Sequence, residues 1–455
     1  LKRRRRFGSQ PAPVTLRAMF AGAGSVGFRK RRRRLGPFYT DDGPDILYYH
    51  DAYPDGAKIS SELFSPMLWV HTLAFVDDGP AAVAVTCRLL AELAEDEDLW
   101  RRFCLQWRPE ALLCFQGSWR ATAFPDPASS RWAESTGTCI DVPTLPPPLG
   151  VAGLQVRPSS DISQSSFVED FDQLRQPVLI KGGAERVVSD PGSWSLKALS
   201  ERYGERDFAC VVQDPGASPH RHVRMRLCDY IEYASRNRDL EPLYLFDSDV
   251  PAALLGTIRA PEFLGRDYFS ALEGTAVEER WWLAVGGAQS GTRLHVDPFE
   301  TSAWNLVTEG RKRWVLFPPS AWPPALDWSS DGSFVAPGAA MWFQMLNEGA
   351  KAACRREGCL EIEQGPGDLL FVPHGWWHCV VNLELTVAFT QNVITAANCV
   401  DAFQALESLD PTAAALLRKA ASDDLGSAAF ERRESREPPR RPPHCGDCGH
   451  RAPER

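Results

Sequence analysis

From Trp281 to about residue 395, the sequence consists of short apolar segments separated by turn residues. Thr301–Phe317 has the pattern of a hairpin, with one strand, a turn at Glu309-Gly310 and a return strand. Gly365–Asp368 is a second turn, and it leads into another apolar run. Many short strands with turns between them are typical of a jelly-roll barrel, and we predict that fold for this region.

The sequence on either side of this region has a different character. With 455 residues, the chain is long enough for two or more domains. Residues 81–94 and 99–107 carry apolar side chains at helical spacing, and Asp96 is placed to cap the second helix. The Pro-rich residues 143–148 mark a boundary, because proline cannot donate to a helix or a sheet ladder. We predict six segments: a basic disordered tail (1–57), a small helical domain (58–122), a Pro-rich linker (123–154), a catalytic barrel with flanking helices (155–400), a helical segment (401–430) and a disordered Pro/Arg-rich tail (431–455).

The overall composition is that of a soluble protein. Hydrophobic residues make up 44% of the chain and charged residues 24%, which is the usual balance for a globular protein with a sizeable core. No apolar run approaches the roughly 20 residues that a membrane-spanning helix needs, so we predict no membrane span.

Basic residues are concentrated at the beginning of the chain. The net charge is −9, but the first forty residues contain no Asp or Glu and include the runs Lys2–Arg6 and Arg29–Arg34. Such runs are typical of nuclear-import signals or nucleic-acid contacts, and they predict a protein of the nucleus, or of nucleus and cytoplasm. A solvated tail and an organellar transit segment are the alternatives. Because the chain starts with Leu1 and its first methionine is Met19, the natural start stays open.

The twelve cysteines are scattered without regular spacing, which favours reduced thiols over a disulfide framework. The close pair Cys445 and Cys448 is flanked by His444 and His450, and this combination is able to bind zinc. However, it lies in a Pro/Arg-rich tail without a second cysteine pair, so an unstructured tail is the alternative.

A metal-binding pattern lies inside the predicted barrel. His295 and Asp297 are two residues apart, and side chains at that spacing point to the same face of a strand. His378, at the start of another strand-like run, is the best third ligand, while His374 competes with it from a Pro-His-Gly turn. Two histidines and one carboxylate leave three positions free on an Fe(II) ion, as non-haem oxygenases require. Taken alone, a His-x-Asp pair in a strand is usually structural.

Lys312 falls early on the predicted return strand, and Trp314 and Leu316 follow at alternate positions. A lysine on the inner face of a barrel is costly unless an anion pairs with it, and a dicarboxylate co-substrate would supply that anion. The alternative is that Lys312 points outward like its neighbours Arg311 and Arg313, which periodicity does not exclude.

These segments resemble a known family. His295-Val296-Asp297 with the distal histidine, the segment Pro298–Pro318 and the segment Gly365–Val393 are similar to the JmjC oxygenases, in particular to their arginine-demethylase and lysyl-hydroxylase branch. The resemblance covers about residues 165–400 and implies a double-stranded β-helix of the cupin type. It implies that His295, Asp297 and His378 bind iron. It also implies that Lys312 pairs with the distal carboxylate of 2-oxoglutarate, helped by Asn305 and Thr390. Three further residues would line the co-substrate or substrate pocket: Thr292, Asn392 and Tyr244.

A looser resemblance covers residues 58–107, where Trp69, Leu90, Trp100 and Phe103 follow a pattern similar to an F-box. An F-box would recruit the adaptor subunit of a ubiquitin ligase. The usual Leu-Pro opening is missing, and the alternative is a small helical bundle that packs on the catalytic domain.

The resemblance implies a dioxygenase that uses Fe(II), 2-oxoglutarate and O₂ on protein substrates. The reaction would be lysyl hydroxylation or demethylation of N-methyl arginine or lysine, with histones or RNA-processing factors as candidate substrates. An RNA-directed hydroxylase and an F-box-type adaptor that uses the barrel only for binding are the alternatives. The complete metal triad together with Lys312 favours an enzyme. Neither the substrate nor the oligomeric state follows from the sequence.

Overall fold

The computed structural model describes residues 97–123, 144–213, 221–328 and 334–431. The two basic runs, the predicted helix at 81–94, the cap at Asp96 and the Cys445/Cys448 pair lie outside these ranges. Among the described helices, none has both the length and the apolar character required to cross a membrane.

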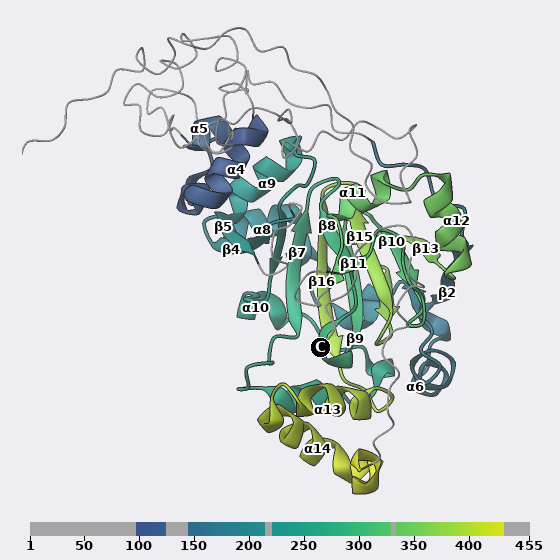
Figure 1. Cartoon of the computed structure of the whole chain (residues 1–455). Helices are drawn as coiled ribbons and strands as arrows, with labels where there is room; N and C mark the ends of the chain where they lie inside the picture. The colour runs from purple at the N-terminus through teal and green to yellow at the C-terminus, as the bar shows by residue number, and fades with distance from the viewer. Residues whose placement is uncertain (1–96, 124–143, 214–220, 329–333, 432–455) are drawn as a thin grey trace, which may run out of the picture. The chain divides into compact units, whose positions relative to one another are not determined.

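The centre of the described chain forms two mixed sheets (Figure 1). The smaller sheet has five strands, in the order β1 (Ala152–Gly153), β13 (Leu360–Gln364), β10 (Lys312–Phe317), β15 (Trp377–Asn382) and β8 (Gly291–His295). The larger sheet has nine, in the order β2 (Gln155–Pro158), β3 (Val178–Lys181), β14 (Leu369–Val372), β9 (Ser302–Glu309), β16 (Thr386–Val393), β7 (Trp281–Gly286), β6 (Tyr244–Asp247), β4 (Asp207–Val211) and β5 (His222–Arg226). A separate pair consists of β11 (Asp327–Trp328) and β12 (Phe334–Val335).

The central strands are buried on both faces. Along β9, Trp304 and Leu306 pack into the main hydrophobic cluster, while Ala303 and Asn305 point the other way and line a cavity between the sheets. Because successive side chains of a strand alternate, each central strand contributes one row to the barrel interior and one row to the core beneath the flanking helices. This arrangement agrees with the predicted jelly-roll architecture.

The predicted hairpin at Thr301–Phe317 is wrong, although its two strands exist. β9 pairs with β14 and β16, whereas β10 pairs with β13 and β15, so the Glu309-Gly310 turn carries the chain from one sheet to the other. Gly310 has a φ of +77°, and a Cβ atom there would lie 2.4 Å from the Leu385 carbonyl oxygen. Hairpin turns and such corners use the same turn residues, which is why the local sequence did not distinguish them.

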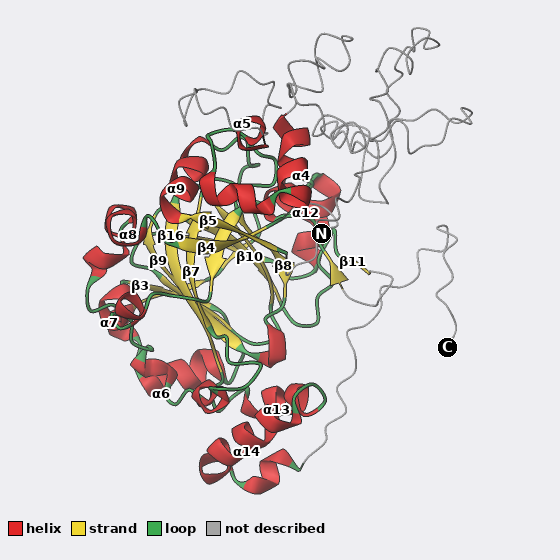
Figure 2. Ribbon diagram, turned by 90° about the vertical axis from the view of Figure 1, so that its left-hand side faces the viewer, coloured by secondary structure: helices red, strands yellow, loops and turns green. Residues whose placement is uncertain are grey.

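The helices flank the sheets, and Figure 2 shows α6, α7 and α8 along one side of the larger sheet. The predicted helix at 99–107 is confirmed, and it begins two residues earlier than expected. The predicted helical segment at 401–430 is divided, because Asp410 caps a new helix that begins with Pro411. The α-helices are α4 (Glu97–Trp107), α5 (Trp119–Ala123), α6 (Gln164–Phe167), α7 (Ala184–Val187), α8 (Leu196–Tyr203), α9 (Leu227–Arg236), α10 (Ala252–Leu255), α11 (Ala339–Gln344), α12 (Glu348–Arg356), α13 (Cys399–Glu407) and α14 (Pro411–Leu425).

Helix α4 packs on the barrel domain. Trp100, Phe103 and Cys104, which belong to the F-box-like pattern, are buried in the same hydrophobic cluster as Phe208 and Tyr233. An adaptor subunit would therefore find these side chains covered. Only residues 97–123 of this region are described, so the F-box-like pattern as a whole stays a prediction.

The Pro-rich segment after residue 143 is attached to the smaller sheet. The buried Arg313 guanidinium donates to the carbonyls of Pro146 and Pro147, at 2.6 and 3.0 Å. The Leu149 amide donates to the Glu361 carboxylate at 2.8 Å. These contacts place the Arg313 side chain on the outer face of β10, and they fix the end of the predicted linker.

Candidate active site

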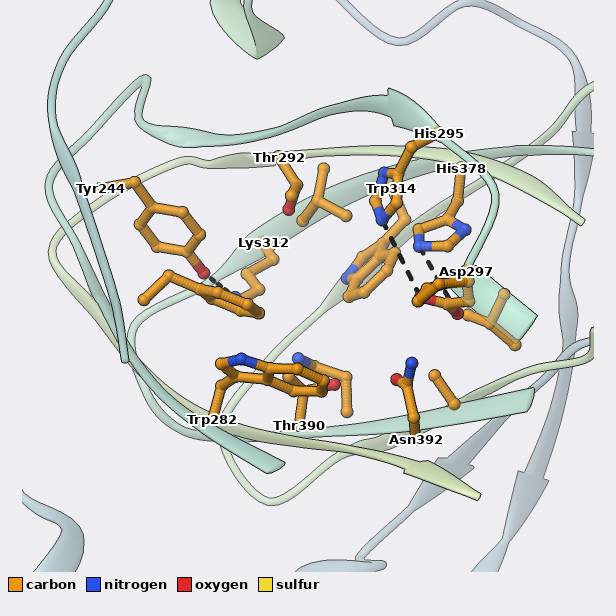
Figure 3. A pocket seen from close by; sticks show the side chains of 16 residues that line it. Tyr244, Trp282, Thr292, His295, Asp297, Lys312, Trp314, His378, Thr390 and Asn392 are labelled. Atoms are coloured by element: carbon orange, nitrogen blue, oxygen red, sulfur yellow. Dashed lines mark hydrogen bonds and ion pairs between the residues drawn. The ribbon is translucent and has the colours of Figure 1, made fainter. Parts of the chain in front are cut away.

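A cavity of about 170 Å³ lies between the two sheets (Figure 3). All nine site residues expected from the sequence line it, although they come from strands scattered over both sheets. They are Tyr244, Thr292, His295, Asp297, Asn305, Lys312, His378, Thr390 and Asn392.

The three expected metal ligands converge at one end of this cavity. His295 ends β8, and His378 lies directly opposite it on β15, so their rings are 4.1 Å apart. Asp297 follows β8, and its two carboxylate oxygens lie 3.9 Å from His295 Nε2 and 4.0 Å from His378 Nε2. One ligand atom from each residue lies within 4.8 Å of the other two, which is a suitable arrangement for one metal ion.

The two imidazoles are oriented by backbone carbonyls. His295 Nδ1 lies 2.7 Å from the Arg293 carbonyl oxygen, and His378 Nδ1 lies 3.1 Å from that of Trp376. A carbonyl oxygen only accepts, so Nδ1 carries the proton and Nε2 keeps a free lone pair on the side of Asp297. Burial lowers the pKa of His378 well below its usual value, which keeps this imidazole neutral, as a metal ligand must be.

The competing ligand His374 does not reach the metal site. It is buried outside the cavity lining, and its Nε2 lies 3.1 Å from the Asp401 carboxylate on α13. The preference for His378 over His374 is therefore confirmed.

Lys312 lies at the other end of the cavity, and its expected inward direction is confirmed. The side chain is 2% exposed, and Nζ donates to the Tyr244 hydroxyl at 2.9 Å. Burial lowers the pKa of Lys312 to about 7. Within the described ranges, no carboxylate lies close enough to form an ion pair with this amine, so the cavity contains one cation whose charge is not balanced.

The wall between the two ends is polar on the side of the larger sheet. Thr390 Oγ1 donates to the Trp304 carbonyl at 3.1 Å, and Asn392 Nδ2 donates to Thr301 Oγ1 at 3.0 Å. The buried Asn305 Oδ1 has no hydrogen-bond partner among the described residues. Because a buried polar atom is usually paired, this amide is available to a polar ligand in the cavity.

The donor set fits Fe(II) with a chelating dicarboxylate. Two neutral imidazoles and one carboxylate form the ligand set of non-haem iron oxygenases and leave coordination positions open. Lys312 supplies a buried amine, and Asn305 an amide whose oxygen is unpartnered within the described ranges, in the same cavity as the triad.

The sequence did not identify three aromatic residues of the cavity: Phe246, Trp282 and Trp314. Phe246 stacks on Trp282 with ring centroids 5.5 Å apart, and Trp282 lies opposite Thr390 in the ladder between β7 and β16. Strand alternation would have found two of them, because Phe246 is two residues after Tyr244 and Trp314 is two after Lys312.

The chain is similar to known proteins in this same region. A family profile described as "JmjC domain, hydroxylase" matches residues 282–393. The chain is 30% identical over 379 residues to lysine-specific demethylase JMJ21 of Arabidopsis thaliana, with 77% of this chain and 39% of that protein covered. It is 35% identical over 245 residues to the bifunctional arginine demethylase and lysyl-hydroxylase psr-1 of Caenorhabditis briggsae, with 52% and 60% covered.

A third relative is the human 2-oxoglutarate and iron-dependent oxygenase JMJD4, which is 26% identical over 292 residues, with 60% of this chain and 68% of that protein covered. The chain spans less than two thirds of the length of JMJ21 and of psr-1. The profile match lies on the strands that carry the metal triad and Lys312. Residues 282–393 therefore match the JmjC-domain hydroxylases, and they contain the strands of the candidate site apart from β6.

Proposed function

We propose that this chain is an Fe(II)- and 2-oxoglutarate-dependent dioxygenase that oxidises a C–H bond of a protein side chain. The observation that carries the proposal is the pairing of two sites in one cavity: a metal triad at one end and a buried, unbalanced lysine at the other. A dicarboxylate that chelates the metal and ends at Lys312 would satisfy both. Bound iron with 2-oxoglutarate and O₂ supplies the oxidising power for the C–H bond.

The protein residues bind, orient and exclude water. His295 and His378 direct their Nε2 atoms toward Asp297, and their Nδ1 atoms are fixed by backbone carbonyls. Lys312 would bind the distal carboxylate of 2-oxoglutarate, and the buried site strengthens this charge–charge contact. The apolar faces of Trp314 and Val380 line the same space and exclude bulk water from it.

A protein substrate is supported by the names of the relatives, which describe demethylation of lysine or arginine and hydroxylation of lysine. We propose lysyl hydroxylation or N-methyl demethylation for this chain. Both outcomes require a side chain that reaches the metal from solvent. Apart from Asp297, no carboxylate lines the described cavity, so a cationic side chain would be held by aromatic faces such as that of Trp282.

The test is succinate release from 2-oxoglutarate by the purified chain with Fe(II) and O₂. We expect release by the wild type and none above background by His295→Ala. Equal release by both proteins would refute the proposal. Mass spectrometry of histone and RNA-processing-factor peptides after turnover then separates the two reactions, since hydroxylation adds oxygen to lysine and demethylation removes a methyl group.

A further inference from the structure

The metal ligand Asp297 is followed by a backbone turn that residues with a Cβ atom rarely adopt. Phe299 and Glu300 both have a φ of +55°. This left-handed conformation costs free energy for side chains such as these, and it persists only where the surrounding structure holds it. Strained backbone is concentrated at functional sites, so the contacts that hold this turn bear on where the Asp297 carboxylate lies.

The turn connects the metal site with the C-terminal helices. Asp297 precedes it and lines the cavity, whereas the Phe299 side chain packs against the hydrophobic cluster that contains the buried faces of α13 and α14. Figure 2 shows both helices beyond one end of the sheets. Thr301 closes the turn, because its amide and its hydroxyl donate to the Pro298 carbonyl at 3.1 and 2.8 Å. A change within this turn would therefore move Asp297 relative to the two histidines.

Asn398, at the beginning of α13, binds the strained turn. Its Nδ2 donates to the Glu300 carbonyl at 2.8 Å and to the Val393 carbonyl at 3.3 Å. Its Oδ1 accepts from the Thr395 amide at 2.7 Å and from the Thr395 hydroxyl at 3.1 Å. Because the two carbonyls only accept, the orientation of the Asn398 amide is fixed by its partners. The side chain is 0% exposed, and both of its polar atoms are paired.

These bonds differ from the ones that an asparagine usually makes at this position. Asn398 is the N-cap residue of α13, and an asparagine there normally accepts from the free amides of the first helical turn. The Asn398 side chain makes no such bond. By contrast, Asp410 at the N-cap of α14 accepts from the Thr412 and Ala413 amides. The Asn398 side chain therefore holds the turn at Glu300 instead of capping its own helix.

We propose that Asn398 is a positioning residue for the metal ligand Asp297. By binding the Glu300 carbonyl, it keeps the turn left-handed and so holds the Asp297 carboxylate where its oxygens face the two histidines. Asn398 does not line the cavity, and it acts only through the backbone of the turn. The inference rests on the proposed function, because it concerns the metal site of that function.

The test is a measurement of metal binding, which needs no turnover. Calorimetry would give the Kd of Mn(II) for the full chain without 2-oxoglutarate. We expect Asn398→Ala to raise this Kd about tenfold, as for other residues that orient a metal ligand. Asp410→Ala is the matched control, because it removes the cap of the neighbouring helix and leaves the turn untouched. It should lower stability and leave the Kd unchanged, and an equal loss of affinity would reduce Asn398 to a structural role.

Rescue by glycine separates the role further. Glycine adopts a positive φ without a Cβ clash, so in a Glu300→Gly background the turn depends less on Asn398. There, Asn398→Ala should cost clearly less Mn(II) affinity than in a Glu300→Ala background, which lacks the same carboxylate but keeps the strain. A double-mutant cycle measures this coupling.

The outcomes are distinct. Equal losses in the glycine and alanine backgrounds, or no loss in either, would overturn the role of Asn398 and leave the proposed function standing. No binding of Mn(II) by the wild type would instead refute the proposed function. If Asn398→Ala does not fold, Thr395→Val takes its place, because it removes one of the bonds that hold the Asn398 amide. It should show a smaller loss that glycine at position 300 again reduces.

Discussion

Lys312 Nζ donates to the Tyr244 hydroxyl oxygen at 2.9 Å, and this neutral group is the partner of a fully enclosed amine. A phenol does not balance an ammonium charge. Burial disfavours the charged form of Lys312 and lowers its pKa to about 7, and the phenol does not offset this effect. An arriving dicarboxylate would reverse that effect, so binding of the co-substrate and protonation of Lys312 are thermodynamically linked.

The first expected consequence concerns pH. Above pH 7 the free amine is mostly neutral, and 2-oxoglutarate must bind together with a proton. We expect the Kd of 2-oxoglutarate for the Mn(II)-loaded protein to rise as pH increases through 7, approaching about tenfold per pH unit. Calorimetry in buffers of different ionisation enthalpy would measure the proton uptake. In Lys312→Met, the proton uptake should disappear together with most of the affinity for 2-oxoglutarate. A wild-type Kd that stays constant from pH 6.5 to 8.5 would contradict the linkage.

The same pKa has a consequence for stability without ligand. The ordinary lysine value of 10.5 falls to about 7 in the folded chain, so between these values the unfolded chain holds a proton that the native chain lacks. The free energy of unfolding should therefore rise with pH across this window, and the full penalty is present below pH 7. Urea unfolding of the wild type and Lys312→Met would show it, since the difference between them should shrink as pH increases. A constant difference would mean that Lys312 is not desolvated.

Metal binding should depend on the triad and not on the neighbouring histidine. We expect Mn(II) to raise the melting temperature of the wild type, and His378→Ala to weaken Mn(II) binding by about 100-fold or more, because one of the three metal ligands is lost. His374→Ala is the matched control, since this buried histidine contacts Asp401 on α13. It should lower stability while it keeps the Mn(II)-dependent increase. The opposite result would identify His374 as a ligand.

The contact between α4 and the barrel domain should be strongly stabilising. Asp239 accepts from Arg101 Nε at 3.1 Å, Trp119 Nε1 at 3.0 Å and the Tyr233 hydroxyl at 2.6 Å. Removing one partner of a buried pair leaves an uncompensated charge, so Asp239→Ala should reduce the free energy of unfolding by about 3–5 kcal/mol. Denaturant titration measures this. The exposed pair formed by Arg236 and Glu232 is the control, and Glu232→Gln should change stability by about 0.5 kcal/mol or less.

Gly310, in the turn between β9 and β10, should be required both for its positive φ and for the lack of space around it. Gly310 has a φ of +77°, and an added Cβ would also meet the Leu385 carbonyl oxygen at 2.4 Å. Gly274 has a similar φ of +82° but open space around it. Gly274→Ala should therefore cost about 1 kcal/mol from backbone strain alone, and Gly310→Ala should cost clearly more. Equal losses in denaturant titration would mean that the carbonyl moves away freely.

The sequence predicted the site better than it predicted the topology. His295 and Asp297 share a face because of strand alternation, which is a local property. The direction of Lys312 was left open because Arg311 and Arg313 flank it. In the structure, Arg313 binds the Pro-rich segment on the outer face of β10. Because side chains alternate along a strand, its neighbour Lys312 points inward.

The errors have a common physical origin. The pairing of β9 and β10 was mispredicted because a turn sequence does not say which sheet receives the next strand. Trp282 was missed because its role depends on which strands become neighbours. Pairing between distant strands is decided by the burial of whole faces, and local patterns do not contain that information.

The pairing of β8 with β15 has a consequence for how this protein is made in the cell. His295 and Asp297 leave the ribosome well before His378, and the ladder that places the two histidines opposite each other forms only after β15 exists. A metal ion can therefore be bound by all three residues only after β15 has been synthesised. A nascent or truncated chain that ends before β15 has two of the metal ligands without the third. It also leaves β8 and one edge of β10 unpaired. Such open strand edges are prone to aggregation.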